Sequence, residues 1–177
     1  MWVKKFRKHK TLKKKLLSLI TKMPSHFKSD KSFVKSDWTV PKDVPREYLK
    51  LFYQEVGDLM VETAEDFGCN TWRIHNGWYN QYSKNNNHHW HTHPESNLSA
   101  IYFVELPNKE LITEFKTKIK LNVKEGDILF FPSYMLHRAP VNNTNKRKTV
   151  IAFNCDFQLI EELTVDGYEV LGRNRLS

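Results

Sequence analysis

The sequence lacks several features that would assign it to a specialised class of protein. Its 177 residues include only two cysteines, Cys69 and Cys155, which are too few for a disulfide scaffold and typical of a reduced, intracellular protein. No apolar run approaches the length that spans a bilayer, and the stretch 16–20 is too short for the core of a secretory signal. The chain has no glycine-rich phosphate loop and no internal repeat. We therefore expect a cytoplasmic protein with one globular core.

Positive charge is concentrated near the N-terminus. The formal net charge is +8, yet residues 1–31 hold eleven Lys or Arg and one acid, whereas the rest of the chain holds 17 bases and 19 acids. The isoelectric point therefore does not make the whole protein a nucleic-acid binder. Residues 3–22 predict a short basic amphipathic helix with four apolar side chains on one face: Leu12, Leu16, Leu19 and Ile20.

Two roles for this helix stay open. It packs its leucines on the domain, or it makes a weak contact with nucleic acid or another acidic surface. We expect residues 1–42 to form a basic N-terminal segment and connector, and residues 43–177 to form the domain that carries the chemistry. On this division, residues 1–23 are dispensable for the chemistry.

The pattern beyond residue 42 predicts one long helix followed by many short strands. Apolar residues recur at helical spacing over residues 44–67, Pro45 suits the first turn, and Gly68 suits the C-cap. Aromatic and β-branched runs separated by polar turns then predict strands. These runs are 71–75, 77–83, 89–93, 98–105, 111–115, 117–123, 127–131 and 148–155. The fold class is therefore mainly β with α, an antiparallel sandwich or barrel with a supporting helix.

Histidines gather at two places among these strands. His91 and His93 are two residues apart, so on a strand their side chains share a face, with Cα atoms about 6.5–7 Å apart. His137 follows the apolar strand 128–131, which begins after a Gly-Asp turn, and we expect it on a loop at the strand end. One ion can accept two imidazoles from a strand and a third from a distant strand. The His-x-His pair alone also fits a surface histidine cluster.

The sequence resembles the 2-oxoglutarate- and Fe(II)-dependent oxygenases, and within them a small branch common in marine bacteria and phages. Four segments over roughly residues 70–157 carry the resemblance. They are Trp78 with Asn80, His91-Thr92-His93-Pro94 with Ser96, Leu98, Ser99 and Tyr102, Gly126 to Ser133 with Leu136-His137, and Lys148 to Asn154. The resemblance implies a double-stranded β-helix (jelly roll) that hydroxylates a substrate and releases succinate and CO₂. It also allows a virus-encoded protein that acts in the host cell.

The resemblance further implies the roles of individual residues. Fe(II) would be held by His91, His93 and His137. The family usually has a carboxylate at the second position, so His93 is a departure, and Ala100 replaces a usual glycine. Other ligand candidates have the right strand parity: Glu95 and His89.

The co-substrate pocket would contain residues from three strands, namely Asn80, Ser99, Tyr102 and Asn154, with Lys148 or Arg147 as the cation for the distal carboxylate. Lys148 shares a strand face with Val150, Ala152 and Asn154, whereas Arg147 lies on the other face. A carboxylate inside a barrel needs a partner cation. We favour Lys148 because the small residues on its strand face leave room for a ligand.

Two other functions use the same fold. A cupin-like jelly roll would use the same histidines for a metal without 2-oxoglutarate. A non-enzymatic jelly roll, such as a virion or binding module, would keep the fold without the chemistry. The sequence leaves the substrate open, whether a small molecule or a peptide.

Overall fold

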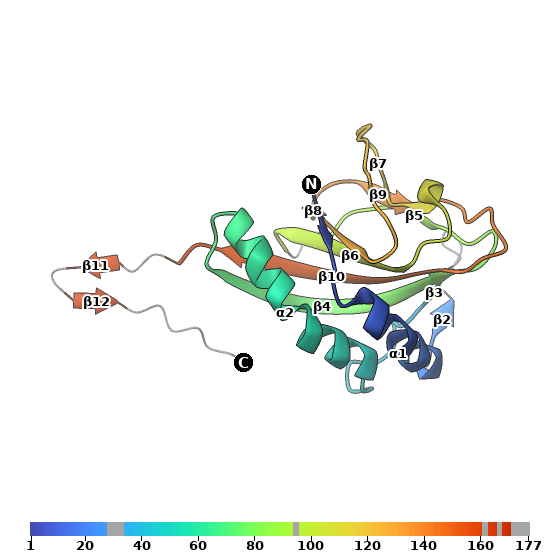
Figure 1. Ribbon diagram of the computed structural model, residues 1–177, viewed down its shortest axis with the longest axis horizontal. Coiled ribbons are helices and arrows are strands. Elements are labelled where there is room, and N and C mark those ends of the chain that lie inside the picture. The colour runs from blue at the N-terminus through green and yellow to red at the C-terminus, as the bar shows by residue number, and fades with distance from the viewer. Residues whose placement is uncertain (28–33, 94–95, 161–162, 166–167, 171–177) are drawn as a thin grey trace.

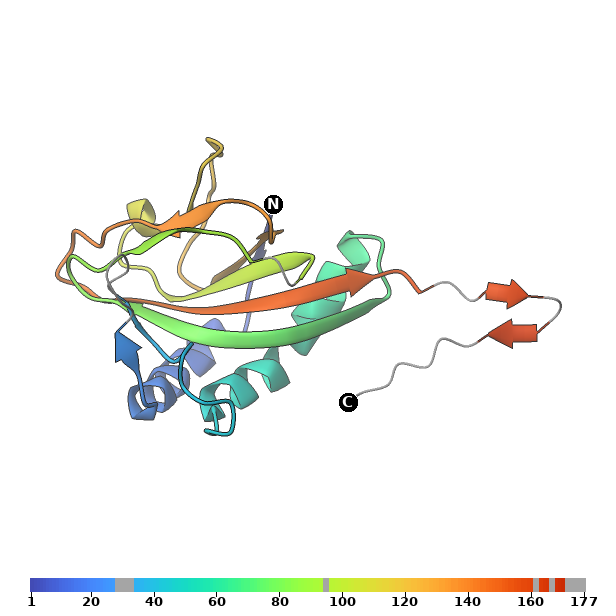
Figure 2. The ribbon, with the colours of Figure 1, turned by 180° about the vertical axis from the view of Figure 1, so that it is seen from behind.

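The computed structural model describes residues 1–27, 34–93, 96–160, 163–165 and 168–170. Its centre is a seven-stranded main sheet in the order β1-β8-β6-β10-β4-β3-β2, and a minor sheet in the order β5-β9-β7 lies over one face of it. Figure 1 shows the helices α1 and α2 on the opposite face, and Figure 2 shows the same three layers from behind. The chain therefore forms the antiparallel two-sheet fold that the strand pattern predicts, in the jelly-roll form that the resemblance implies.

The bounds of the elements follow the turns in the sequence. The main sheet consists of β1 (Trp2–Lys5), β8 (Asp127–Pro132), β6 (Leu98–Glu105), β10 (Lys148–Gln158), β4 (Thr71–Tyr82), β3 (Lys35–Ser36) and β2 (His26–Phe27). The minor sheet consists of β5 (His88–His91), β9 (His137–Ala139) and β7 (Glu114–Phe115). The helices are α1 (His9–Lys22), α2 (Glu47–Asp66) and the short 3-10 turn η1 (Lys109–Leu111). A separate hairpin pairs β11 (Leu163–Val165) with β12 (Tyr168–Val170).

Helix α2 is the expected long helix, and glycine sets two of its features. It ends where Gly68, with φ of +68°, takes the left-handed conformation of a helix C-cap. A Cβ at Gly77 of β4 would clash with the hydroxyl of Tyr53 and lie 3.3 Å from the carbonyl oxygen of Ala152, so glycine lets α2 pack close to the sheet.

The N-terminal segment differs from the expectation of a tail outside the domain. Residues 2–5 are not helical but form β1, which pairs with β8 at the edge of the main sheet. Helix α1 begins only at His9, and its Leu16 and Ile20 are completely buried in the core shared with α2. The expected boundary at residue 42 therefore does not separate two structural units, and removing residues 1–23 would remove part of the sheet and core.

Three strand predictions need correction. Residues 117–123 form no strand, although the alternation of lysine with apolar residues suggested one. The runs 71–75 and 77–83 are one continuous strand, β4, because Gly77 continues the ladder opposite Phe153. Residues 137–139 form β9, where we expected a loop. Among the described residues, no helix combines the length and apolar character needed to cross a bilayer.

Strand alternation divides the main sheet into two chemically different faces. The helix-facing side is apolar and aromatic, with Phe52 of α2 at the centre, stacked on Tyr102 and close to Phe153. The other side has a smaller apolar cluster around Phe103 and Phe131, and beside it a cavity toward the minor sheet. The predicted site residues can therefore act together only if they lie on the cavity side of the main sheet.

Candidate metal centre

Three histidines converge at one end of the minor sheet. His91 ends β5 and His137 begins β9, and the two residues are direct partners across the antiparallel pair. His93 lies beyond the end of β5, where its backbone N–H donates to the carbonyl of Ser133 (2.9 Å). One ligand nitrogen from each histidine lies within 4.8 Å of the others. The structure thus brings together the three residues that the sequence proposed as a metal set.

The imidazoles are oriented by the backbone and by aromatic neighbours. His91 donates from Nδ1 to the backbone carbonyl of His89 (2.8 Å), and His137 donates from Nδ1 to the backbone carbonyl of Met135 (2.8 Å). A neutral imidazole that donates from Nδ1 has its lone pair on Nε2, so these contacts select the tautomer that binds a metal through Nε2. Trp78 stacks on His93 with ring centroids 5.4 Å apart.

Burial keeps the central histidine neutral. His137 is 3% exposed, and desolvation, together with the nearby charge of His91, lowers its pKa to about 4. Phe131 contacts its ring edge-on at 4.7 Å. Metal ligation needs the unprotonated imidazole, so this environment favours ligation at neutral pH.

A fourth histidine, His88, lies beside the set. It is buried, lines the cavity, and stacks on His91 with centroids 4.1 Å apart. Strand parity pointed instead to His89, which is exposed. The register of β5 shifts between His88 and His91, and this irregularity reverses the parity. His89, the alternative ligand that strand parity predicted, is thus exposed and does not line the cavity, and Glu95 lies outside the described residues.

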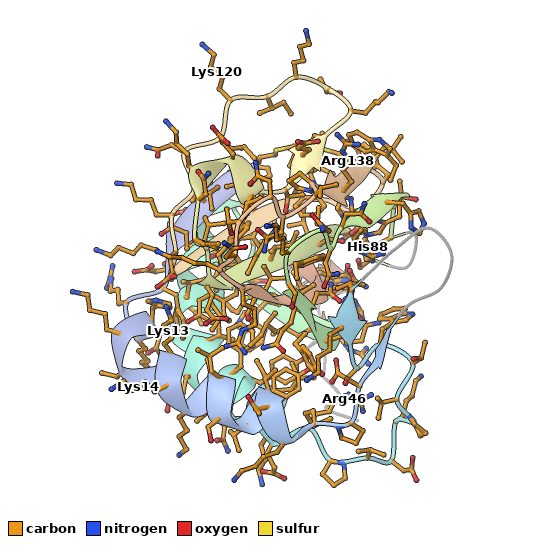
Figure 3. The ribbon with its side chains drawn as sticks, turned by 90° about the vertical axis from the view of Figure 1, so that its right-hand side faces the viewer. Lys13, Lys14, Arg46, His88, Lys120 and Arg138 are labelled. Carbon is orange, nitrogen blue, oxygen red and sulfur yellow. The ribbon has the colours of Figure 1, made fainter. Side chains whose placement is uncertain are left out.

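The cavity next to the histidines is lined by residues of both sheets. Four of the six residues predicted for the co-substrate line it: Asn80, Ser99, Lys148 and Asn154. Tyr82 also lines it, together with three residues that sequence reasoning missed: His88, Thr113 and Arg138. Figure 3 shows His88 and Arg138 on the minor-sheet side of the molecule, across from Lys13 and Lys14 of α1.

Lys148 is the cation of this cavity. It is 2% exposed and lies over the ring of Tyr82, with Nζ 5.0 Å from the centroid. Burial lowers its pKa to about 7, although Glu114 raises it. No acid among the described residues forms an ion pair with it. A buried ammonium without a carboxylate partner is costly, so an anionic ligand would stabilise it.

A polar network around Ser99 and Asn154 lines another part of the cavity. The hydroxyl of Ser99 donates to Asn154 Oδ1 (3.0 Å), and the amide of Asn154 donates to Asn76 Oδ1 (3.0 Å). Ser133, next to the His93 backbone, also contacts Ser99 (3.2 Å). These bonds hold polar groups toward the cavity in the middle of an apolar barrel.

Two predicted co-substrate residues lie elsewhere. Tyr102 is on the helix-facing side, where its hydroxyl meets His9 Nδ1 at 2.7 Å. It is three residues from Ser99 on the same strand, and an odd separation places two side chains on opposite faces. Arg147 is at the surface, where its guanidinium binds both carboxylate oxygens of Glu105 (2.8 and 3.1 Å).

The residues present fit a first-row transition metal. Imidazole is a ligand for iron, zinc, copper and nickel, and a metal held by three imidazoles would have other coordination positions open. No acid among the described residues joins the cluster. The set is therefore neutral, so a bound divalent ion would retain its full charge and attract an anion.

The chain was compared with known proteins. No protein family and no curated protein matches it at the level of sequence. Solved structures match its fold. The viral collagen prolyl hydroxylase of Paramecium bursaria chlorella virus 1, in a 2-oxoglutarate complex, has a TM-score of 0.56 and 13% identity, over 90% of this chain and 97% of that one.

Two bacterial structures match similarly. An oxidoreductase of the 2OG-Fe(II) oxygenase family from Burkholderia pseudomallei has a TM-score of 0.56 and 11% identity, over 81% of this chain and 76% of that one. HygX of Streptomyces hygroscopicus, with nickel and 2-oxoglutarate bound, has a TM-score of 0.61 and 10% identity, over 86% of this chain and 81% of that one. The chain therefore has the fold of 2-oxoglutarate- and Fe(II)-dependent oxygenases.

Proposed function

We propose that this protein is a 2-oxoglutarate- and Fe(II)-dependent dioxygenase. One observation carries the proposal: three convergent histidines and a buried lysine without an acidic partner among the described residues line the same cavity. A metal site alone fits many jelly rolls, and a buried cation alone fits many anion sites. A co-substrate with an oxo-acid at one end and a carboxylate at the other needs both. The shared fold supports the same conclusion.

The residues of this chain would divide the work between them. His91, His93 and His137 hold the metal, and Lys148 holds the distal carboxylate of the co-substrate. When bound, Fe(II) and 2-oxoglutarate supply an O₂-derived oxidant that hydroxylates a C–H bond, with release of succinate and CO₂. Trp78 lines the cavity and covers His93, which restricts water.

The absence of a carboxylate from the described histidine set alters the charge of the site. A neutral set leaves two positive charges on the metal, which a dianionic co-substrate neutralises. The buried ammonium of Lys148 adds attraction at the far end. The departure from the usual two histidines and one carboxylate is therefore compatible with 2-oxoglutarate.

A cupin-like metal site without 2-oxoglutarate is the second candidate, because the same three histidines would serve it. Lys148 distinguishes this candidate from the dioxygenase, because a cupin-like site without 2-oxoglutarate does not need a buried ammonium in the cavity. The third candidate, a non-enzymatic jelly roll, requires neither metal nor co-substrate.

The test is metal analysis joined to a 2-oxoglutarate titration. The full chain is loaded with Fe(II) without oxygen, and binding is followed by the visible absorption of the iron–2-oxoglutarate complex. We expect one iron per chain, saturable 2-oxoglutarate binding, and succinate when O₂ is admitted. Iron without 2-oxoglutarate binding would favour the cupin-like site, and failure of both would favour the non-enzymatic fold.

Finer assignments rest on the sequence motifs. We propose membership of the marine bacterial and phage branch, a cytoplasmic location that includes the host cell of a virus, and a small molecule or peptide as substrate. Among the matching structures, a prolyl hydroxylase in complex with a peptide fragment is in keeping with the peptide alternative.

A further inference from the structure

The nine basic residues within positions 1–27 divide into two groups, and no acid lies in this stretch. Four of them form ion pairs with acids of α2 or of the turn before β8: Lys4, Arg7, Lys8 and Lys13. The other five are exposed and form no ion pair with any described residue: Lys5, Lys10, Lys14, Lys15 and Lys22. The first group ties the N-terminal segment of β1 and α1 to the rest of the domain, and the second is left for a partner.

Four members of the second group, all except Lys5 of β1, gather on one face of α1. The exposed residues of the helix are Lys10, Thr11, Lys14, Lys15, Ser18, Thr21 and Lys22. At 3.6 residues per turn they fall within a continuous arc of about 140° that contains neither an acid nor an apolar side chain. Figure 3 shows this side of α1 at the edge of the molecule, where Lys13 and Lys14 are labelled. We call these seven residues the lysine face.

We propose that the lysine face is a docking surface for the phosphodiester backbone of a nucleic acid. Lys10 and Lys22 are twelve residues apart, which is about 18 Å along the helix. That length matches about five phosphates of one DNA strand at 3.4 Å each. A row of cations is complementary to a linear, evenly charged polyanion.

The apolar side chains of α1 argue against a membrane. A helix that lies on a bilayer inserts apolar residues and keeps its lysines toward water. Here Leu16 and Ile20 are buried in the core, and Leu12, Leu17 and Leu19 pack against it. The surface thus offers charge without an inserting group.

The position of the lysine face separates docking from chemistry. α1 covers one face of the main sheet, and the minor sheet lies over the other face (Figure 1). The histidine cavity is lined by residues of the minor sheet and of the main-sheet strands opposite it. A nucleic acid on α1 would leave the cavity accessible. The proposal does not depend on the function of that cavity, and binding is measured without turnover.

The test uses the full chain and a fluorescent DNA duplex of about 20 base pairs, followed by anisotropy from about 50 to about 200 mM salt. One variant changes Lys10, Lys14, Lys15 and Lys22 to Gln. The matched control changes four exposed lysines elsewhere, Lys42, Lys84, Lys109 and Lys120, to Gln, so that both proteins have the same net charge.

We expect the wild type and the control to bind with Kd on the order of micromolar at low salt, and the α1 variant to bind at least about tenfold more weakly. The slope of log affinity against log salt should fall by about 3 to 4, since each phosphate contact contributes about 0.9. Equal loss in both variants, or no binding by the wild type, would overturn the proposal. Stronger binding to vesicles of about one-third phosphatidylserine than to the duplex would also overturn it and indicate a membrane.

Discussion

The two faces of the main sheet are made by alternating residues of the same strands, yet they differ in chemistry. Along β10, Ile151 and Cys155 face the helices, while Lys148 and Asn154 line the cavity. The helix side buries hydrocarbon against hydrocarbon, and each large side chain there contributes about 1.5–3 kcal/mol. The cavity side buries an ammonium, imidazoles and amides, which burial alone disfavours.

This difference indicates how the fold supports its site. Stability comes from the helix side, where Phe6, Phe52 and Tyr102 pack as an aromatic cluster. That surplus offsets the polar groups of the cavity. Substitutions on the helix side should therefore change unfolding and leave ligand binding intact, and substitutions on the cavity side should do the reverse.

The largest expected effect is on the metal. His91→Ala, His93→Ala and His137→Ala should each abolish stoichiometric Fe(II) binding, because two imidazoles hold a divalent ion far less tightly than three. The measurement is iron per chain by elemental analysis, with circular dichroism to show that the fold persists. His75→Ala is the control, since His75 pairs with Asp156 outside the cluster. Full iron content in any of the three variants would contradict the ligand set.

The next effect is on stability, from the helix side. Ile20→Ala should reduce the unfolding free energy by about 2–5 kcal/mol, because the side chain is completely buried and leaves a cavity. Urea denaturation measures the change. Lys15→Ala, on the exposed side of the same helix, should change it by less than about 0.5 kcal/mol. Similar small effects from both would mean that α1 is a tail after all.

The third effect is on the co-substrate. Lys148→Ala should weaken 2-oxoglutarate binding about tenfold to a hundredfold and leave iron content unchanged, because the distal carboxylate loses its cation. Titration of the iron-loaded variant measures it. Unchanged affinity would place the anchor elsewhere in the barrel.

The fourth effect is a pH dependence of stability that arises from the burial of Lys148, independently of its role in binding. In the folded protein the pKa of Lys148 is about 7, and in the unfolded chain it is about 10.5. Between these values the unfolded chain holds a proton that the folded protein has released, so the unfolding free energy rises with pH, by at most about 1.4 kcal/mol per unit.

Lys148→Met removes this dependence. The metal-free variant should be more stable than the wild type near pH 7, and the difference should shrink toward about pH 9. Urea denaturation at the two pH values provides the comparison. A difference that stays constant with pH would mean that Lys148 is not desolvated.

The sequence predicted the fold class and the metal-binding candidates because both depend on local patterns. The helix 44–67 was right to within three residues at its start, since apolar spacing and Gly68 mark it clearly. The convergence of His91 with His137 followed from two short motifs at strand ends. Such features are set by residues close together in the chain.

Features that depend on distant contacts were missed. The sequence assigned residues 3–8 to a helix, because it cannot show that β8 offers an open edge to β1. It chose His89 over His88, because a register irregularity leaves no mark in composition. Tyr102 was an avoidable error, since its odd separation from Ser99 already placed it on the helix side.

The smallest expected effect belongs to Arg147, the residue next to Lys148. The two neighbours face opposite ways: Lys148 is buried in the cavity, whereas Arg147 binds Glu105 at the surface. Surface ion pairs contribute about 0–1 kcal/mol, and Glu105 also accepts a hydrogen bond from Thr149, so it keeps a partner when the arginine is lost. Arg147→Ala should therefore leave 2-oxoglutarate affinity unchanged and lower the unfolding free energy by less than about 1 kcal/mol. Both are measured beside Lys148→Ala in the same titration and denaturation experiments. A larger loss of 2-oxoglutarate affinity in Arg147→Ala than in Lys148→Ala would reverse the assignment of the two faces.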